Sequence, residues 1–380
     1  MAQNISSAAY ADTKQHYYLL DGLRGVAALM VIVYHLFECF PAETWIIGHG
    51  YLAVDFFFIL SGFVVGYAYD DRWSKRVPEG KRLTVWGFFK RRLIRLHPMV
   101  VMGIALGVLT FYIQGGAQWD GTRMAVSAVM LAVLLHLFFI PEIPGAGSDV
   151  RGNGEMFPLN GPHWSLFFEY IGNIFYALLL RRLSTKLLTV WVIVMGVAFA
   201  AFGVSDVVGY GSIGVGWTLD GMNFWGGLLR MTFPFSCGLL MSRVFKPMKI
   251  RGAFWLCTAL IVAFLSVPNL GGWNCVYEVC CVIVVFPVVV YMAASGVTTD
   301  ATSSGLCRFL GDISYPLYAV HYPFMYLFYH YIGFPETWRT PAETWPWMVA
   351  LAVGNIVLAY AALKLYDEPL RKWLARKLNS

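Results

Sequence analysis

Apolar segments long enough to cross a lipid bilayer recur along almost the whole chain. They are mostly 17 to 22 residues long and lie near 19–40, 51–69, 98–114, 124–141, 163–180, 187–203, 223–242, 253–267, 273–293, 312–332 and 346–366. A helix needs about 20 apolar residues to cross a hydrocarbon core, and open sheets cannot span lipid. Only 13% of the residues are charged, against about 25% in a soluble domain. The sequence therefore predicts an all-α, polytopic integral membrane protein that forms a single domain over residues 1–380.

The basic residues between these segments predict the orientation of the chain. Clusters of Lys and Arg lie at 70–97, 181–186, 243–251 and 371–377, whereas the connections 41–50, 204–222 and 268–272 contain neither residue. Cytoplasmic loops carry an excess of Lys and Arg. We therefore expect a multi-pass protein of the inner (plasma) membrane whose N-terminal segment 1–18 and tail 367–380 are both cytoplasmic. The net charge of +6 lies in these short blocks, so membrane lipids are expected as partners and nucleic acid is not.

One part of the chain does not fit this alternation. Three apolar stretches, 98–114, 124–141 and 163–180, lie between two basic loops that are both expected inside. A return to the same side needs an even number of crossings. We therefore expect about ten transmembrane helices, plus one re-entrant or tilted segment between residues 98 and 180 that protein or a polar cavity covers.

The first apolar segment carries Arg24 and His35, and ionisable groups inside a membrane are candidates for function. They lie eleven residues apart, which places them on one helix face, separated by roughly 16 Å along the axis. Arg24 alone would be explained by its side chain reaching toward lipid headgroups, and His35 by a bond to a neighbouring helix. For a pair on one face we favour a functional role, with His35 as a catalytic residue.

Two carboxylates are candidate partners of His35. Asp55 lies four residues into the second apolar segment, at a depth similar to that of His35, and Glu169 lies about two turns into its own segment. A carboxylate beside an imidazole fixes its tautomer and strengthens it as a general base. The alternative for Asp55 is a helix cap near the interface, and the two readings are about equally supported. Glu169 could instead hold the acceptor.

A basic cluster at Lys90–His97 places Arg92 and Arg95 on one helical face. Planar guanidinium groups suit the phosphates of a nucleotide-like ligand. Anchoring to anionic lipid is the simpler explanation for several of these charges. No phosphate-binding glycine motif of a soluble nucleotide fold is present in the sequence. The cysteines show no metal-ligand spacing, so no metal site is predicted.

Five stretches in order resemble membrane acyltransferase family 3. They are Asp21-Gly-Leu-Arg24-Gly with His35, Val54-Asp-Phe-Phe-Phe-Ile-Leu-Ser-Gly-Phe63, Arg91-Arg-Leu-Ile-Arg95-Leu-His-Pro98, Trp164-Ser-Leu-Phe-Phe-Glu169, and Ser314-Tyr-Pro-Leu-Tyr-Ala-Val-His-Tyr-Pro323. The resemblance covers nearly the whole chain. It implies an O-acyltransferase that uses acetyl-coenzyme A as acyl donor and a cell-surface glycan or lipid-linked saccharide as acceptor.

The resemblance also assigns residues. Its Arg-x10-His pattern falls on Arg24 and His35, and its membrane-edge arginine motif on Arg92 and Arg95. We expect the donor to be bound by Arg24, Arg92 and Arg95. The acceptor is expected to contact Trp164, Tyr318 and His321.

These expectations combine into one mechanistic hypothesis. Acyl-coenzyme A docks from the cytoplasm, its pantetheine arm covers the distance from Arg24 to His35, and His35 deprotonates an acceptor hydroxyl with help from Asp55 or Glu169. A covalent acyl-His35 or acyl-Ser61 intermediate is an alternative. The competing class of protein is a transporter or flippase for a glycan or lipid-linked precursor, although no inverted repeat is visible in the hydropathy. A membrane sensor or assembly subunit without chemistry is the third class.

Overall fold

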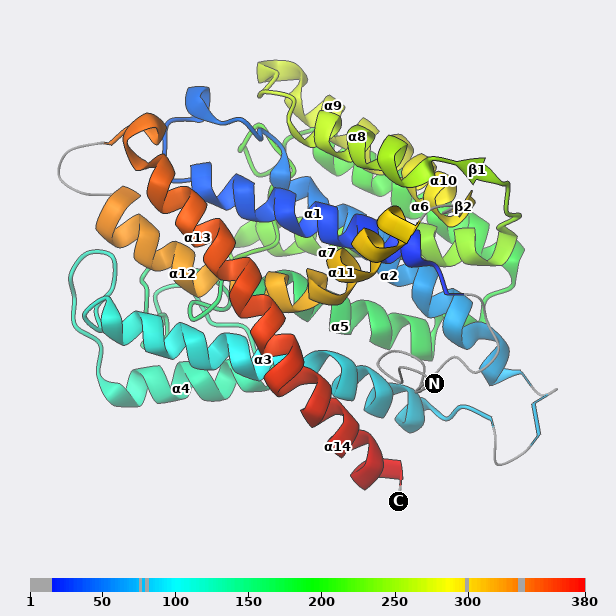
Figure 1. Ribbon diagram of the computed structural model, residues 1–380, viewed down its shortest axis with the longest axis horizontal. Coiled ribbons are helices and arrows are strands. Elements are labelled where there is room, and N and C mark those ends of the chain that lie inside the picture. The colour runs from blue at the N-terminus through cyan, green and yellow to red at the C-terminus, as the bar shows by residue number, and fades with distance from the viewer. Residues whose placement is uncertain (1–15, 75–76, 79–81, 298–300, 334–338, 380) are drawn as a thin grey trace.

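Most of the long helices run roughly along the long axis of the molecule (Figure 1). The computed structural model describes residues 16–74, 77–78, 82–297, 301–333 and 339–379. Its helices of seven or more residues are α1 Tyr18–Phe37, α2 Ala53–Tyr69, α3 Val85–Ile113, α4 Val126–Leu137, α5 His163–Leu178, α6 Thr185–Val204, α7 Gly221–Val244, α8 Ala253–Leu265, α9 Asn274–Cys280, α10 Phe286–Ala294, α11 Ala301–Val320, α12 Tyr322–Phe328, α13 Pro341–Ala362 and α14 Glu368–Asn379. The two short strands, β1 Ile250–Arg251 and β2 Gly296–Val297, pair in parallel.

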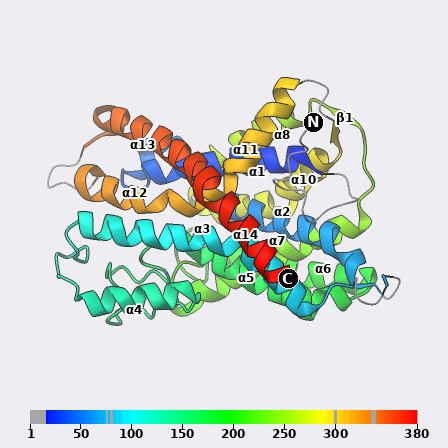
Figure 2. The same cartoon turned by 60° about the horizontal axis from the view of Figure 1, so that its bottom comes forward.

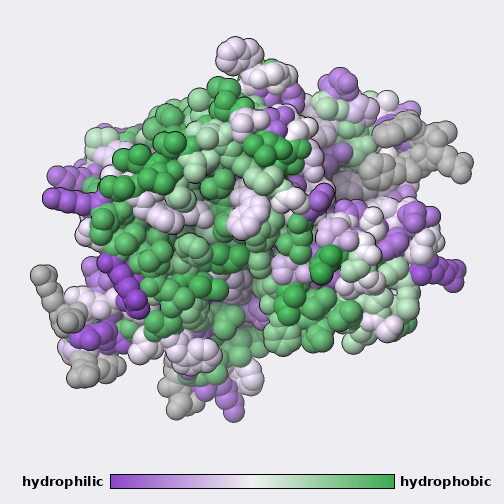
Figure 3. Space-filling view, turned by 180° about the vertical axis from the view of Figure 1, so that it is seen from behind, coloured by the Kyte–Doolittle hydropathy of each residue, from purple (hydrophilic) through white to green (hydrophobic). Residues whose placement is uncertain are grey.

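The surface has the polarity pattern of a membrane protein. Figure 3 shows a broad apolar field across one face, with hydrophilic residues gathered toward the margins. Among the described residues, six helical stretches are long and apolar enough to cross a membrane, namely Tyr18–Phe37, Gly50–Trp73, Val85–Ile113, Thr185–Val204, Gly271–Ala294 and Pro341–Leu378. The all-α class is thereby confirmed, whereas the count of about ten crossings is not and stays a prediction. Most of the predicted N-terminal segment 1–18 lies outside the described residues.

The region in which we expected an incomplete crossing contains one short helix. Helix α3 has 29 residues, α5 has 16 and α4 has only 12. Twelve helical residues rise about 18 Å, less than the about 30 Å of a hydrocarbon core. Of the three apolar stretches between residues 98 and 180, the second is therefore the best candidate for one that does not cross.

Glycines bring the central helices into backbone contact. A Cβ atom added to Gly62 of α2 would lie 1.9 Å from the carbonyl oxygen of Phe235, and one added to Gly238 of α7 would lie 2.0 Å from that of Ile59. Gly25 lets α1 approach Leu310 of α11 in the same way. Lipid tails are as apolar as the helix surfaces, so the hydrophobic effect does not drive helices together inside a bilayer. Helices associate there through close packing, which small residues such as glycine permit.

The last apolar stretches are divided differently from the sequence expectation. The stretch 312–332, expected as one apolar segment, is divided between α11 and α12. Pro316 lies inside α11, and the chain bends at His321, between α11 and α12. Pro323 lies in the first turn of α12, where its missing N–H would have had no helical partner. Helix α14 continues from α13 and packs on α3, as Figure 2 shows.

Candidate active site

His35 lies in the last turn of α1 and is oriented by a glutamate that follows the same helix. Its Nδ1 lies 2.7 Å from Oε2 of Glu38, three residues later. A carboxylate only accepts hydrogen bonds, so His35 donates from Nδ1 and keeps the lone pair of Nε2. The hydroxyl of Tyr329 donates to the same carboxylate oxygen at 3.0 Å. The arrangement is a carboxylate–imidazole dyad whose free nitrogen can accept a proton.

Asp55, which we predicted beside His35, is paired with Arg230 instead. Arg230 donates from Nη2 to Asp55 Oδ2 at 2.6 Å and from Nε to both carboxylate oxygens at 3.2 Å. The two side chains are 1% and 0% exposed. The carboxylate of Asp55 therefore neutralises a buried guanidinium, and the position next to the imidazole belongs to Glu38.

Glu169 lies in a different place from His35 and also has a cationic partner. Arg92 donates from Nη2 to Glu169 Oε1 at 2.6 Å, and the hydroxyl of Ser61 donates to the same oxygen at 2.9 Å. Nε of Arg92 is buried and has no acceptor among the described residues.

A first cavity, which we call the arginine cavity, brings together the residues predicted to bind the donor. It is lined by Arg24, Arg92 and Arg95 together with Glu169. Apolar side chains of α2 form much of its wall, namely Val54, Phe57, Phe58 and Val64. Arg24 donates to Asp21 at 3.0 Å within its own helix. Three guanidinium groups at the edge of an apolar cavity suit a molecule with phosphates at one end and an uncharged arm at the other.

A second cavity, which we call the histidine cavity, contains the dyad. It is lined by Val31, Tyr34, His35, Glu38, Tyr51, Val54, Asn153, Glu155, Gly161, Pro162, Trp164, Ser212, Gly214, Trp217, Arg230, Tyr318 and Tyr322. The predicted acceptor contacts Trp164 and Tyr318 thus lie in one cavity with His35. Burial raises the pKa of Glu155, in the loop before α5, to about 7.

His321 lies behind the dyad rather than in front of it. The rings of His35 and His321 are stacked, with their centroids 5.5 Å apart and 30° between their planes. His321 donates from Nδ1 to the carbonyl oxygen of Tyr318 at 2.9 Å. It is fully buried and does not line either cavity. The predicted contact between His321 and the acceptor is therefore not part of this arrangement.

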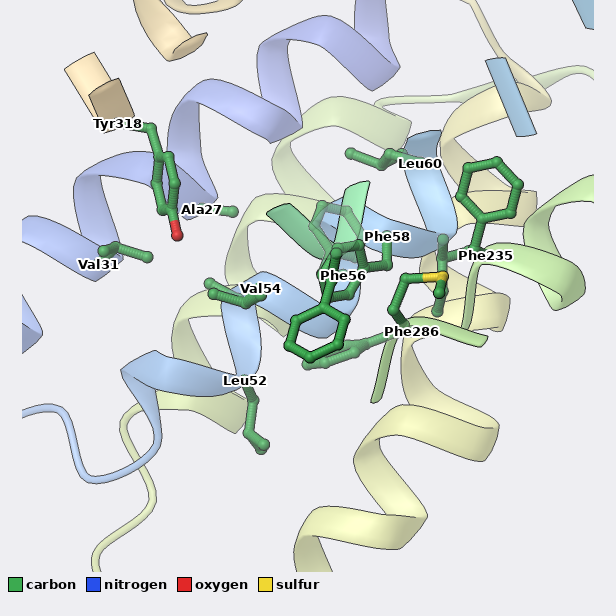
Figure 4. Packing of buried hydrophobic residues seen from close by; sticks show 14 of the residues in the cluster. Ala27, Val31, Leu52, Val54, Phe56, Phe58, Leu60, Phe235, Phe286 and Tyr318 are labelled. Carbon is green, nitrogen blue, oxygen red and sulfur yellow. The ribbon is translucent and has the colours of Figure 1, made fainter. Parts of the chain in front are cut away.

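The two cavities meet at two residues. Val54 and Tyr318 line both of them, so the cavity lined by guanidinium groups is the direct neighbour of the cavity that contains the dyad. Figure 4 shows Tyr318 reaching from α11 toward Val54 of α2, beside Ala27 and Val31 of α1. Among the described residues no group of three or more His, Cys, Asp or Glu side chains is placed to hold a metal ion.

Sequence reasoning missed Glu38 and Arg230, and each had a usable signal. Glu38 lies three residues after His35, within the same predicted segment 19–40, and this is a spacing at which helical side chains meet. Arg230 lies in the middle of the stretch 223–242, and a charge at such a position needs a partner.

Comparison with known proteins gives a consistent family assignment. A family model described as an acyltransferase domain matches residues 17–364. Acyltransferase MdmB of Streptomyces mycarofaciens is 26% identical over an alignment that covers 94% of this chain and 92% of that protein. Protein 2 in picA locus of Rhizobium radiobacter is 36% identical over 50% of this chain and 97% of that protein. O-acetyltransferase OatA of Staphylococcus aureus is 37% identical over an alignment that covers 24% of this chain and 13% of that protein. No solved structure matches.

Proposed function

The chain belongs to membrane acyltransferase family 3 and is an O-acyltransferase, and on that premise we propose a donor, an acceptor and a direction of transfer. The enzyme moves an acyl group, acetyl in the first instance, from cytoplasmic acyl-coenzyme A. The acceptor is a hydroxyl of a cell-surface or exported glycan on the outer side. The protein lies in the inner membrane with both termini in the cytoplasm.

One observation carries this proposal. The arginine cavity and the histidine cavity share Val54 and Tyr318 as lining residues, so the guanidinium groups and the candidate general base lie on the two sides of these side chains. The helix that bears both Arg24 and His35 separates them by roughly 16 Å along its axis. An extended pantetheine arm covers such a distance, which lets a thioester reach His35 while its phosphates stay with the guanidinium groups.

The arginine cavity binds the donor through charge. Arg24, Arg92 and Arg95 supply guanidinium donors, which pair well with phosphate oxygens. Glu169 accepts from Nη2 of Arg92, and a guanidinium group has five N–H donors, so Arg92 can bind a phosphate oxygen as well as Glu169. The apolar wall formed by α2 accommodates the uncharged arm.

The acyl transfer takes place in the histidine cavity. His35 Nε2 accepts the proton of the acceptor hydroxyl while Glu38 stabilises the imidazolium that forms. The hydroxyl oxygen bonds to the thioester carbonyl carbon, the carbon–sulfur bond breaks, and the leaving thiolate takes the proton from His35. The products are an ester and free coenzyme A, and the dyad returns to its starting state.

The side chains that line the histidine cavity suit a sugar as the acceptor. Trp164 and Trp217 offer flat apolar faces, while Glu155 and Asn153 offer hydrogen-bond acceptors. Ligand sites combine such apolar surface with a few polar groups that fix orientation.

The test replaces His35 and measures the amount of ester formed on the glycan. Membrane vesicles from the native host, lacking its own copy of the gene and carrying each variant, receive acetyl-coenzyme A with a labelled acetyl group. His35→Ala is expected to lower label in the membrane glycan by about 10²–10⁴-fold, the contribution of a general base. Coenzyme A should still raise the Tm of this variant, because a ligand that binds only the folded state stabilises it.

The control is His330→Ala, which changes an exposed histidine outside both cavities and is expected to keep wild-type transfer. Labelling of the glycan by His35→Ala at the wild-type rate would reject the proposal. A wild-type protein that moves the glycan across the membrane without labelling it would favour a flippase.

A further inference from the structure

The contact between the two cavities suggests how the enzyme chooses its acyl group. Val54 of α2 and Tyr318 of α11 are the two side chains that line both cavities. We propose that these two residues form a gate that admits an unbranched chain and rejects a branched or aromatic one, so that the donor's acyl group is selected by width. This inference rests on the proposed direction of transfer, from the arginine cavity toward His35.

The tyrosine half of the gate is held in place from two directions. The hydroxyl of Tyr318 lies 2.6 Å from Oγ of Ser165 and donates to the carbonyl oxygen of Pro162 at 3.1 Å. Its ring packs edge-on against Phe57, with centroids 5.6 Å apart and 81° between planes. The Tyr318 side chain is thus held both at its hydroxyl and at its ring, and it cannot rotate away without breaking these contacts.

The valine half is equally constrained. Val54 is only 6% exposed, and a β-branched side chain in a helix has one strongly preferred rotamer. The next residue, Asp55, is tied to Arg230 by a buried ion pair, which fixes this turn of α2. The gate therefore has two rigid sides, which face each other in Figure 4.

The shape of the donor explains what such a gate would select. The arm of coenzyme A ends in an unbranched chain before the sulfur atom, so an opening that admits the arm also admits a straight acyl chain of the same thickness. A branch at the carbon next to the carbonyl adds a methyl group to the cross-section. One methyl group against a fitted apolar wall changes specificity by about 10- to 200-fold.

The experiment compares two donors of identical composition. Butyryl-coenzyme A and isobutyryl-coenzyme A differ only in branching, and the readout is the ratio of their kcat/KM values for labelling glycan in the vesicles described above. The wild-type ratio is expected to favour the straight chain by 10-fold or more. Val54→Ala removes bulk from the gate and should lower that ratio by about 10-fold.

Two control variants make the same kind of change away from the gate. Val64→Ala widens the arginine cavity alone, and Val31→Ala widens the histidine cavity alone. Both are expected to leave the ratio unchanged. Val54→Ile adds one methylene group and should raise the ratio, which keeps the test decisive if Val54→Ala is poorly folded.

The outcomes separate this inference from the function on which it rests. A wild-type enzyme that uses both isomers equally, or a ratio that shifts as much in Val64→Ala or Val31→Ala as in Val54→Ala, would overturn the gate while leaving the transferase in place. Labelling that does not depend on His35 with either donor would overturn the proposed function, and the gate with it.

Discussion

At the scale of single residues, partners decide which buried charges are free to react. Asp55 and Arg230 neutralise one another, and Glu169 engages Arg92. The dyad of His35 and Glu38 is different because His35 lines a cavity and, among the described residues, only Nδ1 of its ring has a hydrogen-bond partner. Breaking a buried pair leaves an uncompensated charge, so the paired residues are poor candidates for proton transfer and the dyad is a good one.

Glu38 is predicted to position the base. Glu38→Gln keeps a hydrogen-bond acceptor near Nδ1 but removes the charge that balances the imidazolium, whereas Glu38→Leu removes both. We expect kcat to be highest in the wild type, lower in Glu38→Gln and lowest in Glu38→Leu. The fall in kcat for Glu38→Leu should be smaller than the about 10²–10⁴-fold fall expected when the general base itself is removed. The donor concentration for half-maximal rate should stay unchanged, because Glu38 does not line the arginine cavity.

Kinetics on the labelled vesicles check this order. Glu43→Gln, an exposed carboxylate in the loop after α1, serves as the matched control and should behave as wild type. Equal activity of wild type and Glu38→Leu would show that the carboxylate has no part in transfer.

At the scale of helices, glycine at points of contact holds the cavity walls together. Gly62 and Gly238 allow α2 and α7 to touch backbone to backbone, and this contact places Arg230 beside Asp55. The same helix α2 carries Val54 of the gate and part of the arginine cavity. The packing of α2 on α7 therefore fixes the position of residues that line both cavities.

Gly62→Ala is predicted to destabilise the protein. The added Cβ would meet the Phe235 carbonyl oxygen at 1.9 Å, and α7 would have to shift. Overpacking of this kind costs about 1–3 kcal/mol. Gly354→Ala is the matched control, since a Cβ at this exposed position of α13 meets nothing within 4 Å and alanine favours a helix by about 1 kcal/mol. Thermal unfolding in detergent should show a lower Tm for the first variant only, and equal Tm values would contradict the close α2–α7 contact.

At the scale of the whole molecule, the two cavities would hold the proposed donor and the proposed acceptor on the two sides of Val54 and Tyr318. The basic clusters of the sequence lie toward the side of Arg92 and Arg95, and the connections without Lys or Arg lie toward the side of His35. By the positive-inside rule, the arginine cavity would open to the cytoplasm. The bilayer then becomes part of the mechanism, because it keeps coenzyme A and the glycan apart except at the gate.

Sidedness gives a direct prediction. Inverted vesicles, which expose the cytoplasmic face, are expected to label their glycan when acetyl-coenzyme A is added outside, and right-side-out vesicles are expected to remain unlabelled until they are permeabilised. A charged donor of this size does not cross lipid unaided. Scintillation counting of extracted glycan measures the difference, and equal labelling of both intact preparations would contradict the proposed direction.

The sequence by itself determined the class of the molecule and the shared helix face of Arg24 and His35. Recurrent apolar segments require membrane-embedded helices because backbone groups must be satisfied within the segment. The eleven-residue spacing of Arg24 and His35 fixes them on one face of a helix. These are local properties, and local geometry can be read from the order of residues.

Only the tertiary structure decided which groups meet. Asp55 and Arg230 are 175 residues apart in the chain, and either could have been the partner of another charge until α2 packed on α7. The proposed gate likewise needs Val54 of α2 and Tyr318 of α11 to line the same cavities, which no periodicity in the sequence specifies. Pairing across helices depends on which faces come into contact, and in lipid that contact is set by the fit of small residues such as Gly62 and Gly238 rather than by hydrophobicity.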